Sequence, residues 1–526
     1  MSNNKKRKDE TAASTGLMQF SMYEKFTDFF VLSLFTIFPF YMTDKLFNVR
    51  QDRLHFFEAS LLILLFFILA TFVCGIDKDK RPPQIFKLSV SDISFLSFTI
   101  VCLLSACLSE YGEEAFTGSG GRNSGFWLML LYFLCFFLVS RFFRSHEIIF
   151  TVFAMISGVV SLIAVMNEFF IDPFNLISCI KEEQQKDFIT TIGNINMFSG
   201  FICVALPVSL ALAVLSKDNA FFAFFCFTSS VNFMGLVIAN SLSGYFGLVV
   251  FMTILFIYCC GNAKRLFKFF VLSTAMLAST KVLRLISYFF KDKYKNLQDV
   301  SKFLIFDRRI FTVIGILLFL TIGTYYLQSK FGEKHSPKWV TISVSSLAGL
   351  AALALVGTLV YFSVINTETD LGSMAKILRL NDQWGTHRGF AWIRGFRLFK
   401  SHGIKNFLVG SGPDTFGQLI KSEYRDEMVK RYNSIFDTAH NEFLNYLVTT
   451  GLLGFISYVT LIFAVIIRGI RRCSQTPELL IPILVITAYA AQSIFNLATP
   501  IITPYMFLFL GIGENMIRVT NRKNTK

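Results

Sequence analysis

Residues 198–215 read FSGFICVALPVSLALAVL, eighteen consecutive positions without a charged side chain. A run of that length, wound into a helix, can cross the hydrocarbon core of a bilayer. The sequence predicts about fourteen such segments and therefore an all-α, polytopic integral membrane protein with one long external helical loop. The segments lie at 26–42, 56–73, 90–108, after the loop 110–125 as far as Arg141, then at 148–169, 198–215, 221–240, 245–260, 269–280, 311–328, 340–364, 446–467, 479–497 and 505–517.

Composition agrees with this interpretation and excludes other classes. The 526 residues are 53% hydrophobic and 16% charged, and they include 63 Phe, whereas a soluble domain carries roughly 25% charged residues. The spans use up the length, so a large soluble enzyme domain has no room. The net charge of +15 comes largely from Lys and Arg in short loops and tails, which is the signal of cytoplasmic loops and not of nucleic-acid binding.

Cysteine usage indicates neither a disulfide framework nor a metal site. The ten Cys form no C-x-x-C motif, and most lie in or at the ends of apolar runs, where Cys behaves as a small hydrophobic residue. We expect no metal and no cofactor.

Basic tails set the predicted topology. We expect residues 1–25 to form a basic cytoplasmic tail, 26–364 to hold spans one to eleven, 365–445 to lie outside, 446–517 to hold the last three spans, and 518–526 to form a second cytoplasmic tail. The segment 269–280 is short for a span, and 281–309 is basic. Both termini lie inside only if the number of spans is even, which requires 269–280 to cross the membrane. This count of spans places 281–309 outside.

The external segment is the one place with room for a site outside the lipid. Its residues 366–442 hold 11 Lys/Arg and 9 Asp/Glu. Within it, Thr386-His387-Arg388-Gly389-Phe390-Ala391-Trp392 places Arg388 and Trp392 on one helix face. An Arg at headgroup level suits phosphate oxygens, which its planar fork binds in pairs. The alternative is an Arg that snorkels beside a Trp anchor at the membrane interface.

Two further motifs follow in the external segment. Gly410-Ser411-Gly412-Pro413 indicates a tight turn where the backbone approaches another group closely, or else a plain turn. His440-Asn441-Glu442 stands at the mouth of an apolar run, where an imidazole can take a proton from a hydroxyl near neutral pH. The alternative is a hydrogen-bonded interfacial His, and His387 and His402 are competing candidate bases.

Together these motifs resemble the signature of the O-antigen ligase family, which also includes flippase-dependent polysaccharide polymerases and bacterial protein O-oligosaccharyltransferases. The matching elements, in order, are Arg388-x-x-x-Trp392, Gly410-x-Gly412-Pro413, His440-Asn441-x-Phe443-Leu444 and Gly451-Leu452-Leu453-Gly454. The resemblance is strongest over 388–458, and the family-like region spans about 197–465.

Weaker matches lie upstream, in the order that the family shows. Gly121-Arg122-Asn123-Ser124-Gly125 looks like the first external Arg motif, and Gly193-Asn194-Ile195-Asn196 like the Gly-Asn-x-Asn element. Ser241-Leu242-Ser243-Gly244 falls where the family commonly has Ser-Arg-Gly, so Leu242 replaces an Arg. Either Arg122 with Arg388 suffices, or a residue of 281–309 substitutes, or the chain belongs to a less common subgroup.

The resemblance implies a membrane glycosyltransferase that uses neither metal nor nucleotide. Its donor would be an oligosaccharide on a polyprenyl diphosphate, such as undecaprenyl diphosphate, at the outer face of the bacterial plasma membrane. Arg388 and Arg122 would hold the diphosphate, His440 would be the general base, and Asn441 and Glu442 would orient it. The supporting residues would be Trp392, Gly410, Gly412, Asn194, Asn196 and Ser243.

The acceptor stays open at this point. A polymerase would use a second lipid-linked glycan, and a ligase would use a lipid, a protein or another glycan, all in the assembly of surface polysaccharide. The alternative function is a transporter or flippase, which predicts ionisable residues at span centres and broken helices. The span centres are nearly free of charge, and Pro207 is the main helix breaker. A non-catalytic membrane scaffold is the third hypothesis.

Overall fold

The computed structural model describes residues 21–524 except 77–86, 120–121, 145, 292, 296, 298, 333, 335 and 402. Nearly all of tail 1–25, most of the basic loop after the second span, Gly121, His402 and the last two residues of tail 518–526 therefore lie outside the described residues. The helices are α2 (Met22–Thr36), α3 (Val49–Val73), α4 (Val90–Cys107), α5 (Glu113–Thr117), α6 (Phe126–Phe142), α7 (Glu147–Glu168), α8 (Glu182–Gln185), α9 (Ile195–Leu215), α10 (Asn219–Ala239), α11 (Leu242–Cys260), α12 (Ala263–Phe289), α13 (Asp299–Phe306), α14 (Arg309–Phe331), α15 (Lys338–Val360), α16 (Ala375–Leu378), α17 (Trp384–Ser401), α18 (Gly403–Val409), α19 (Phe416–Tyr432), α20 (Glu442–Thr449), α21 (Gly451–Arg472), α22 (Leu480–Ser493) and α23 (Thr503–Asn524).

Short elements complete the described chain. A π-helical turn, Tyr361–Ile365, continues α15, and single 3-10 turns cover Gly372–Met374 and Pro477–Leu479. Two strands, β1 (Phe188–Ile189) and β2 (Gly193–Asn194), pair antiparallel, with Phe188 opposite Asn194 and Ile189 opposite Gly193.

Ten of the described helices are long and apolar enough to cross a membrane. Two shorter apolar helices, Phe126–Phe142 and Pro477–Ser493, also coincide with predicted spans. The all-α, polytopic membrane class is therefore confirmed, while the total of fourteen spans stays a prediction. The ten are α3, α4, α7, α9, α10, α11, α12, α14, α15 with its π-helical turn, and α21.

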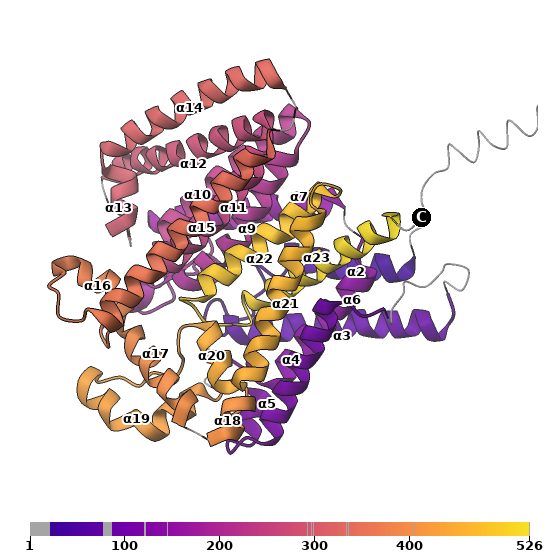
Figure 1. Cartoon of the computed structure of the whole chain (residues 1–526), viewed down its shortest axis with the longest axis vertical. Coiled ribbons are helices and arrows are strands. Elements are labelled where there is room, and N and C mark those ends of the chain that lie inside the picture. The colour runs from indigo at the N-terminus through magenta and orange to yellow at the C-terminus, as the bar shows by residue number, and fades with distance from the viewer. Residues whose placement is uncertain are drawn as a thin grey trace, which may run out of the picture.

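Helix α9, which contains the run 198–215, lies at the centre of the bundle. Every residue from Met197 to Val214 is buried, and α7, α10, α11 and α22 pack around it. The helix continues through Pro207 without a break. By contrast, no residue of α15 is buried, and α14 packs mainly on α12. In Figure 1, α14 stands at the edge of the molecule. In a bilayer, the outward apolar faces of these two helices would contact lipid.

The segment 269–280, which is short for a span, forms the middle of the 27-residue α12, and this helix is long and apolar enough to cross a membrane. The chain beyond α12 returns to the ends of α7 and α10. Lys295 donates its backbone N–H to the Glu168 carbonyl (3.1 Å), and Ser301 Oγ donates to Asn240 Oδ1 (2.7 Å). The predicted external placement of 281–309 stays a prediction.

The two ends of the bundle differ in character. At one end, the first turn of α4 and the C-terminal parts of α6, α21 and α23 share ion pairs to two buried carboxylates. Asp92 pairs with Arg141 (2.6 Å) and with Arg518, and Glu514 pairs with Arg468 (2.7 Å) and Arg518 (3.0 Å). Figure 1 shows the C-terminus at this end, away from α17 and α19. We call the other end, which carries α17, α19 and His440, the site end. Which membrane side each end faces stays a prediction.

The segment between α15 and α21 forms a small helical layer at the site end. Helices α17, α19 and α20 share a core of their own, separate from the main core of the bundle. In Figure 1 this layer lies at the lower left, and α18 packs mainly against α21. Its buried side chains are Phe390, Ala391, Leu398, Phe399, Phe416, Leu419, Ile420, Met428, Ala439 and Val448.

Candidate functional site

Ion pairs hold α17 against α19. Arg394 donates to both oxygens of Asp382 (2.7 and 3.1 Å) and to Glu427 (2.7 Å), and its guanidinium lies 4.5 Å from the centre of the Phe390 ring. Arg431 adds a second ion pair to Asp382 (2.7 Å). Arg394 therefore has a structural role, holding α17 against α19. Arg388, six residues earlier in the same helix, takes no part in these ion pairs.

The first turn of α17 is irregular, and this sets the position of Arg388. Gly385 and His387 have φ values of 60° and 72°. A Cβ at Gly389 would lie 1.9 Å from the carbonyl oxygen of Asn381, so only glycine lets the chain approach that closely. One turn after Arg388, the Trp392 Nε1–H donates to the Ala439 carbonyl (2.9 Å). This bond ties α17 directly to the residue before His440.

Helix α17 carries Arg388 toward the segment that holds His440, because Trp392, one turn after Arg388, is hydrogen-bonded to Ala439. The positive charge of Arg388 also lowers the pKa of the His440 imidazole. Arg388 is half-buried, and burial lowers its pKa. Among the described residues it has neither a hydrogen-bond partner nor a carboxylate within 4 Å. A half-buried guanidinium without a carboxylate partner favours an anionic ligand.

His440 is neutral at physiological pH. The pKa falls from 6.5 to about 4, first because of burial and then because of Arg388; Asp437 opposes this lowering, and Arg122 adds a smaller lowering effect. Its backbone is left-handed (φ 46°), and its N–H donates to Thr438 Oγ1 (3.3 Å). The next residue, Asn441, caps α20 by accepting the Leu444 N–H (3.0 Å). The imidazole thus stands at a fixed point with a lone pair free to accept a proton.

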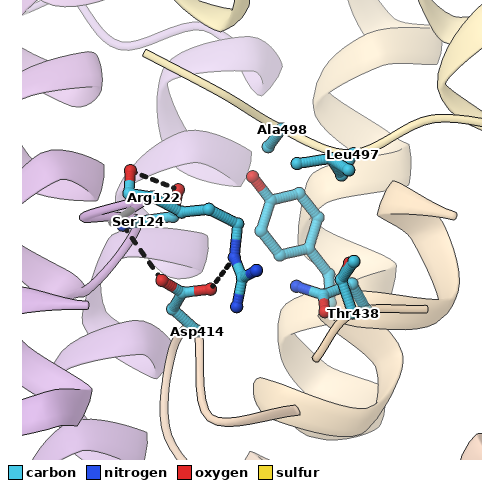
Figure 2. A pocket seen from close by; sticks show the side chains of 8 residues that line it. Arg122, Ser124, Asp414, Thr438, Leu497 and Ala498 are labelled. Atoms are coloured by element: carbon cyan, nitrogen blue, oxygen red, sulfur yellow. Dashed lines mark hydrogen bonds and ion pairs between the residues drawn. The ribbon is translucent and has the colours of Figure 1, made fainter. Parts of the chain in front are cut away.

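Arg122 is engaged by two carboxylates. Its Nε donates to Asp414 Oδ1 (3.2 Å), and its Nη1 and Nη2 donate to Asp437 Oδ2 (2.7 Å) and the Asp437 carbonyl (3.0 Å). Figure 2 shows Arg122 and Ser124 reaching the same Asp414 carboxylate from the loop before α6. Burial alone would lower the pKa of Arg122, but the two carboxylates raise it, so it remains charged.

A narrow pocket lies beside this ion pair. It is lined by Arg122, Ser124, Asp414 and Thr438, together with Asn445, Tyr446, Leu497 and Ala498 (Figure 2). Its volume of about 20 Å³ has room for roughly one water molecule. A glycan cannot enter a pocket of this size in this conformation. Arg122, which lines the pocket, is buried, whereas Arg388 is half-buried and so lies nearer the protein surface.

Two glycines, Gly410 and Gly451, let the turn 410–413 pack closely against the chain where α20 ends and α21 begins. Gly410 and Gly451 have φ values of 81° and 67°. A Cβ on Gly410 would lie 2.2 Å from the Thr449 carbonyl oxygen, and one on Gly451 would lie 2.4 Å from the Leu408 carbonyl. Gly412 donates its N–H to Thr449 (3.0 Å). This is the close backbone approach that Gly-x-Gly-Pro indicates.

We therefore expect Gly410→Ala to destabilise the protein strongly. The new methyl group would overlap backbone atoms, and left-handed φ at a non-glycine residue alone costs about 1–3 kcal/mol. Thermal unfolding of detergent-purified protein measures the effect. The matched control is Gly315→Ala in α14, where a Cβ meets nothing within 4 Å. An unchanged unfolding midpoint for Gly410→Ala would contradict this account of the turn.

Glu442 points into the bundle. It is 1% exposed, and its two oxygens accept hydrogen bonds from the hydroxyls of Tyr458 (2.6 Å) and Tyr489 (2.9 Å). Tyr489 in turn contacts Thr503 Oγ1 (2.9 Å). Glu442 thus joins α20 to α21, α22 and α23, and its predicted orienting role would act through the position of α20.

The upstream motifs form a polar cluster at the starts of α9 and α11. Asn194 accepts the Asn196 N–H (2.9 Å), and Asn196 Oδ1 accepts Ser241 Oγ (2.9 Å), which also lies 2.9 Å from Ser243 Oγ. Asn496 donates to the Asn196 carbonyl (3.3 Å). Phe495, the residue before Asn496, stacks on Trp392, with the two ring centroids 6.0 Å apart. A continuous line of contacts therefore joins this cluster to α17.

Sequence reasoning missed Asp414, Asp437 and Asn496. Asp414 directly follows the Gly-x-Gly-Pro turn and Asp437 precedes His440 by three residues, so proximity to named motifs was the available signal. Of the competing bases, His387 is exposed and packs on the Tyr432 ring (4.5 Å between centroids). His402 lies outside the described residues.

Comparison with known proteins identifies the region that holds these groups. Residues 303–459 match the model of a family described as O-antigen ligase. The match runs from α13 to the first half of α21, and so includes Arg388, the 410–413 turn and His440. A search of the curated proteins found no match to this chain. The family domain supports an O-antigen ligase- or polymerase-type function in polysaccharide assembly. The chain is thus a multi-pass membrane protein whose residues 303–459 match the O-antigen ligase family.

Proposed function

We propose that this protein transfers a glycan from a polyprenyl diphosphate to an acceptor hydroxyl. The observation that carries the proposal is the pair formed by Arg388, a half-buried guanidinium without a carboxylate partner in the described chain, and the neutral His440 beside it. An anionic leaving group needs the first, and an alcohol nucleophile needs the second. Both lie within the family domain.

The reaction is a single displacement at the anomeric carbon. His440 takes the proton of the acceptor hydroxyl as its oxygen attacks that carbon. The bond between the anomeric carbon and the diphosphate oxygen breaks, and the polyprenyl diphosphate leaves with the electron pair. Arg388 stabilises the charge that grows on the departing oxygen. The diphosphate is already a good leaving group, so no acid partner is required, and we expect transfer to continue in EDTA.

Arg122 and the other site residues would support this centre. Arg122 contributes positive charge from its buried position while joining Asp414 to Asp437. Trp392 holds the backbone at Ala439 in place. Gly410 and Gly412 would allow the turn 410–413 to pack closely against the end of α20. Asn194, Asn196 and Ser243 would shape the site where α9 and α11 begin. We place the site on the outer face of a bacterial plasma membrane, with both termini in the cytoplasm.

The low pKa of His440 leads to a pH prediction. The free enzyme should keep its kcat/KM level from neutral pH to below 6.5 and lose it only as pH approaches about 4, since only the neutral imidazole accepts a proton. The acid limb of kcat should lie higher, because a bound diphosphate brings negative charge that raises the pKa of His440. Initial rates across pH test this. A kcat/KM limb at 6.5 would contradict the buried, cation-flanked imidazole.

A product assay tests the function. Purified protein would receive a labelled polyprenyl-diphosphate oligosaccharide as its only substrate. A ladder of longer lipid-linked glycans means a polymerase. A single shifted product that requires an added lipid, protein or glycan acceptor means a ligase. If no acceptor yields product, the proposal fails, and movement of the donor across vesicles would then favour a flippase.

A further inference from the structure

The backbone at His440 is strained. Its φ of 46° lies in the left-handed region, which residues other than glycine seldom adopt. Such a conformation costs free energy and persists where surrounding contacts hold the chain in place. The contacts of the residues on either side therefore show what fixes the position of the imidazole.

Arg122 binds Asp437 through both its side chain and its backbone. Arg122 Nη1 donates to Asp437 Oδ2 (2.7 Å), and Arg122 Nη2 donates to the Asp437 carbonyl oxygen (3.0 Å). Two bonds from one planar guanidinium fix the orientation of the group that they reach, as well as its position. Arg122 thus holds the main chain three residues before His440.

The guanidinium of Arg122 is itself held in place. Asp414 is buried, and its carboxylate accepts hydrogen bonds from Arg122 Nε (3.2 Å) and from the backbone N–H groups of Ser119 (2.9 Å) and Ser124 (3.3 Å). Figure 2 shows Arg122 and Ser124 meeting on this carboxylate. The position of Asp437 is therefore tied, through Arg122, to the residue that follows the 410–413 turn.

Other contacts hold the same segment from α19, α17 and α20. A Cβ at Gly417 would lie 2.8 Å from the Asp437 carbonyl oxygen, so the first turn of α19 packs directly on this peptide group. Trp392 Nε1–H donates to the Ala439 carbonyl (2.9 Å), and Asn441 caps α20. Positions 437, 439 and 441 are thus all fixed, and the proposed base lies between the last two.

We propose that Asp437 is a positioning residue for glycan transfer. Held by Arg122 and packed against Gly417, it keeps the backbone of His440 in the left-handed conformation that presents the imidazole to the acceptor hydroxyl. The inference rests on the proposed function for the role of that imidazole. Because 56% of the Asp437 side chain is exposed, its ion pair adds little to overall stability, and its loss should act locally.

Kinetics and donor binding, measured together, test the proposal. Asp437→Ala should lower kcat roughly 10- to 100-fold, because a displacement of about 1 Å in a reacting group can cost about 100-fold. Its affinity for a labelled polyprenyl-diphosphate oligosaccharide should not fall, since a carboxylate repels a diphosphate. Asp437→Asn should keep most of the wild-type kcat, because the amide oxygen still accepts the Arg122 hydrogen bond.

The matched control and a second readout come from the same layer. Asp426→Ala removes an exposed carboxylate from α19 and should transfer glycan at the wild-type rate. Hydrogen exchange of the backbone amides of residues 437–444 reports local opening without any need for activity. Exchange should be faster than wild type in Asp437→Ala and unchanged in Asp437→Asn.

Wild-type kcat in a folded Asp437→Ala variant would overturn the inference. A fall in donor affinity that matches the fall in kcat would overturn it too, because Asp437 would then shape the donor site. Equal losses of kcat in the Ala and Asn variants would mean that the carboxylate itself takes the proton, which also contradicts a positioning role.

The remaining outcomes separate this inference from the proposed function. If wild-type protein makes no product with any acceptor, the proposed reaction fails. Faster exchange in Asp437→Ala would then still support the positioning role, and unchanged exchange would overturn it. If Asp437→Ala does not elute as a monodisperse species, Gly417→Ala decides, because its methyl group must displace the Asp437 carbonyl or the start of α19. Unchanged kcat in that variant overturns the inference.

Discussion

Replacement of His440 by alanine is expected to lower the rate of glycan transfer by roughly 10²- to 10⁴-fold, the usual contribution of a general base. The imidazole is neutral and lies beside Arg388, so its loss removes the proton acceptor without removing the diphosphate site. The measurement is the initial rate of product formation at saturating donor and acceptor, with elution profile and thermal midpoint recorded for each variant.

The matched control for this variant is His387→Ala. His387 lies at the start of α17, one residue from Arg388, but it is exposed and packs on Tyr432. It should keep most of the wild-type rate. A folded His440→Ala variant with wild-type turnover, or a larger loss in His387→Ala, would show that another group takes the proton.

Arg388→Gln should have the second large effect, a loss of roughly 10²- to 10³-fold in kcat/KM, which is typical when one preorganised donor to a developing anion is removed. Arg388→Lys should restore a part, since a lysine keeps the charge and loses the fork. Steady-state kinetics against donor concentration measure both variants.

The control for Arg388 comes from the same helix. Arg397 is exposed, so Arg397→Gln changes the net charge of α17 equally without altering the site. Its kcat/KM should stay close to the wild-type value. Equal losses in Arg388→Gln and Arg397→Gln would mean that the general charge of the helix, and not a specific contact, attracts the donor.

Much of the fold follows from apolar run length. The run 198–215 is the buried core of α9, and each other predicted span coincides with a helix, because twenty apolar residues have few other stable arrangements. The segment 446–467 is the instructive exception. The apolar pattern runs through Thr450, but Gly451 adopts φ 67° and the chain breaks into α20 and α21 there. Hydropathy does not detect a left-handed glycine.

The site was predictable only where its parts lie close in sequence. Arg388, Trp392 and His440 stand in one segment, and the contact of Trp392 with Ala439 brings them together. Arg122 shows the limit. Its carboxylate partners, Asp414 and Asp437, follow 292 and 315 residues later, and no local pattern reveals such a pairing. Its part in diphosphate binding stays a prediction.

The division of labour between Arg388 and His440 is the central claim, and donor affinity tests it most directly. Equilibrium binding of a labelled polyprenyl-diphosphate oligosaccharide would be measured for wild type, His440→Ala and Arg388→Gln, alongside their turnover. The account predicts wild-type affinity with turnover lowered at least roughly 100-fold for His440→Ala, and weak binding for Arg388→Gln. Equal affinity in all three proteins, or wild-type turnover in His440→Ala, would contradict it.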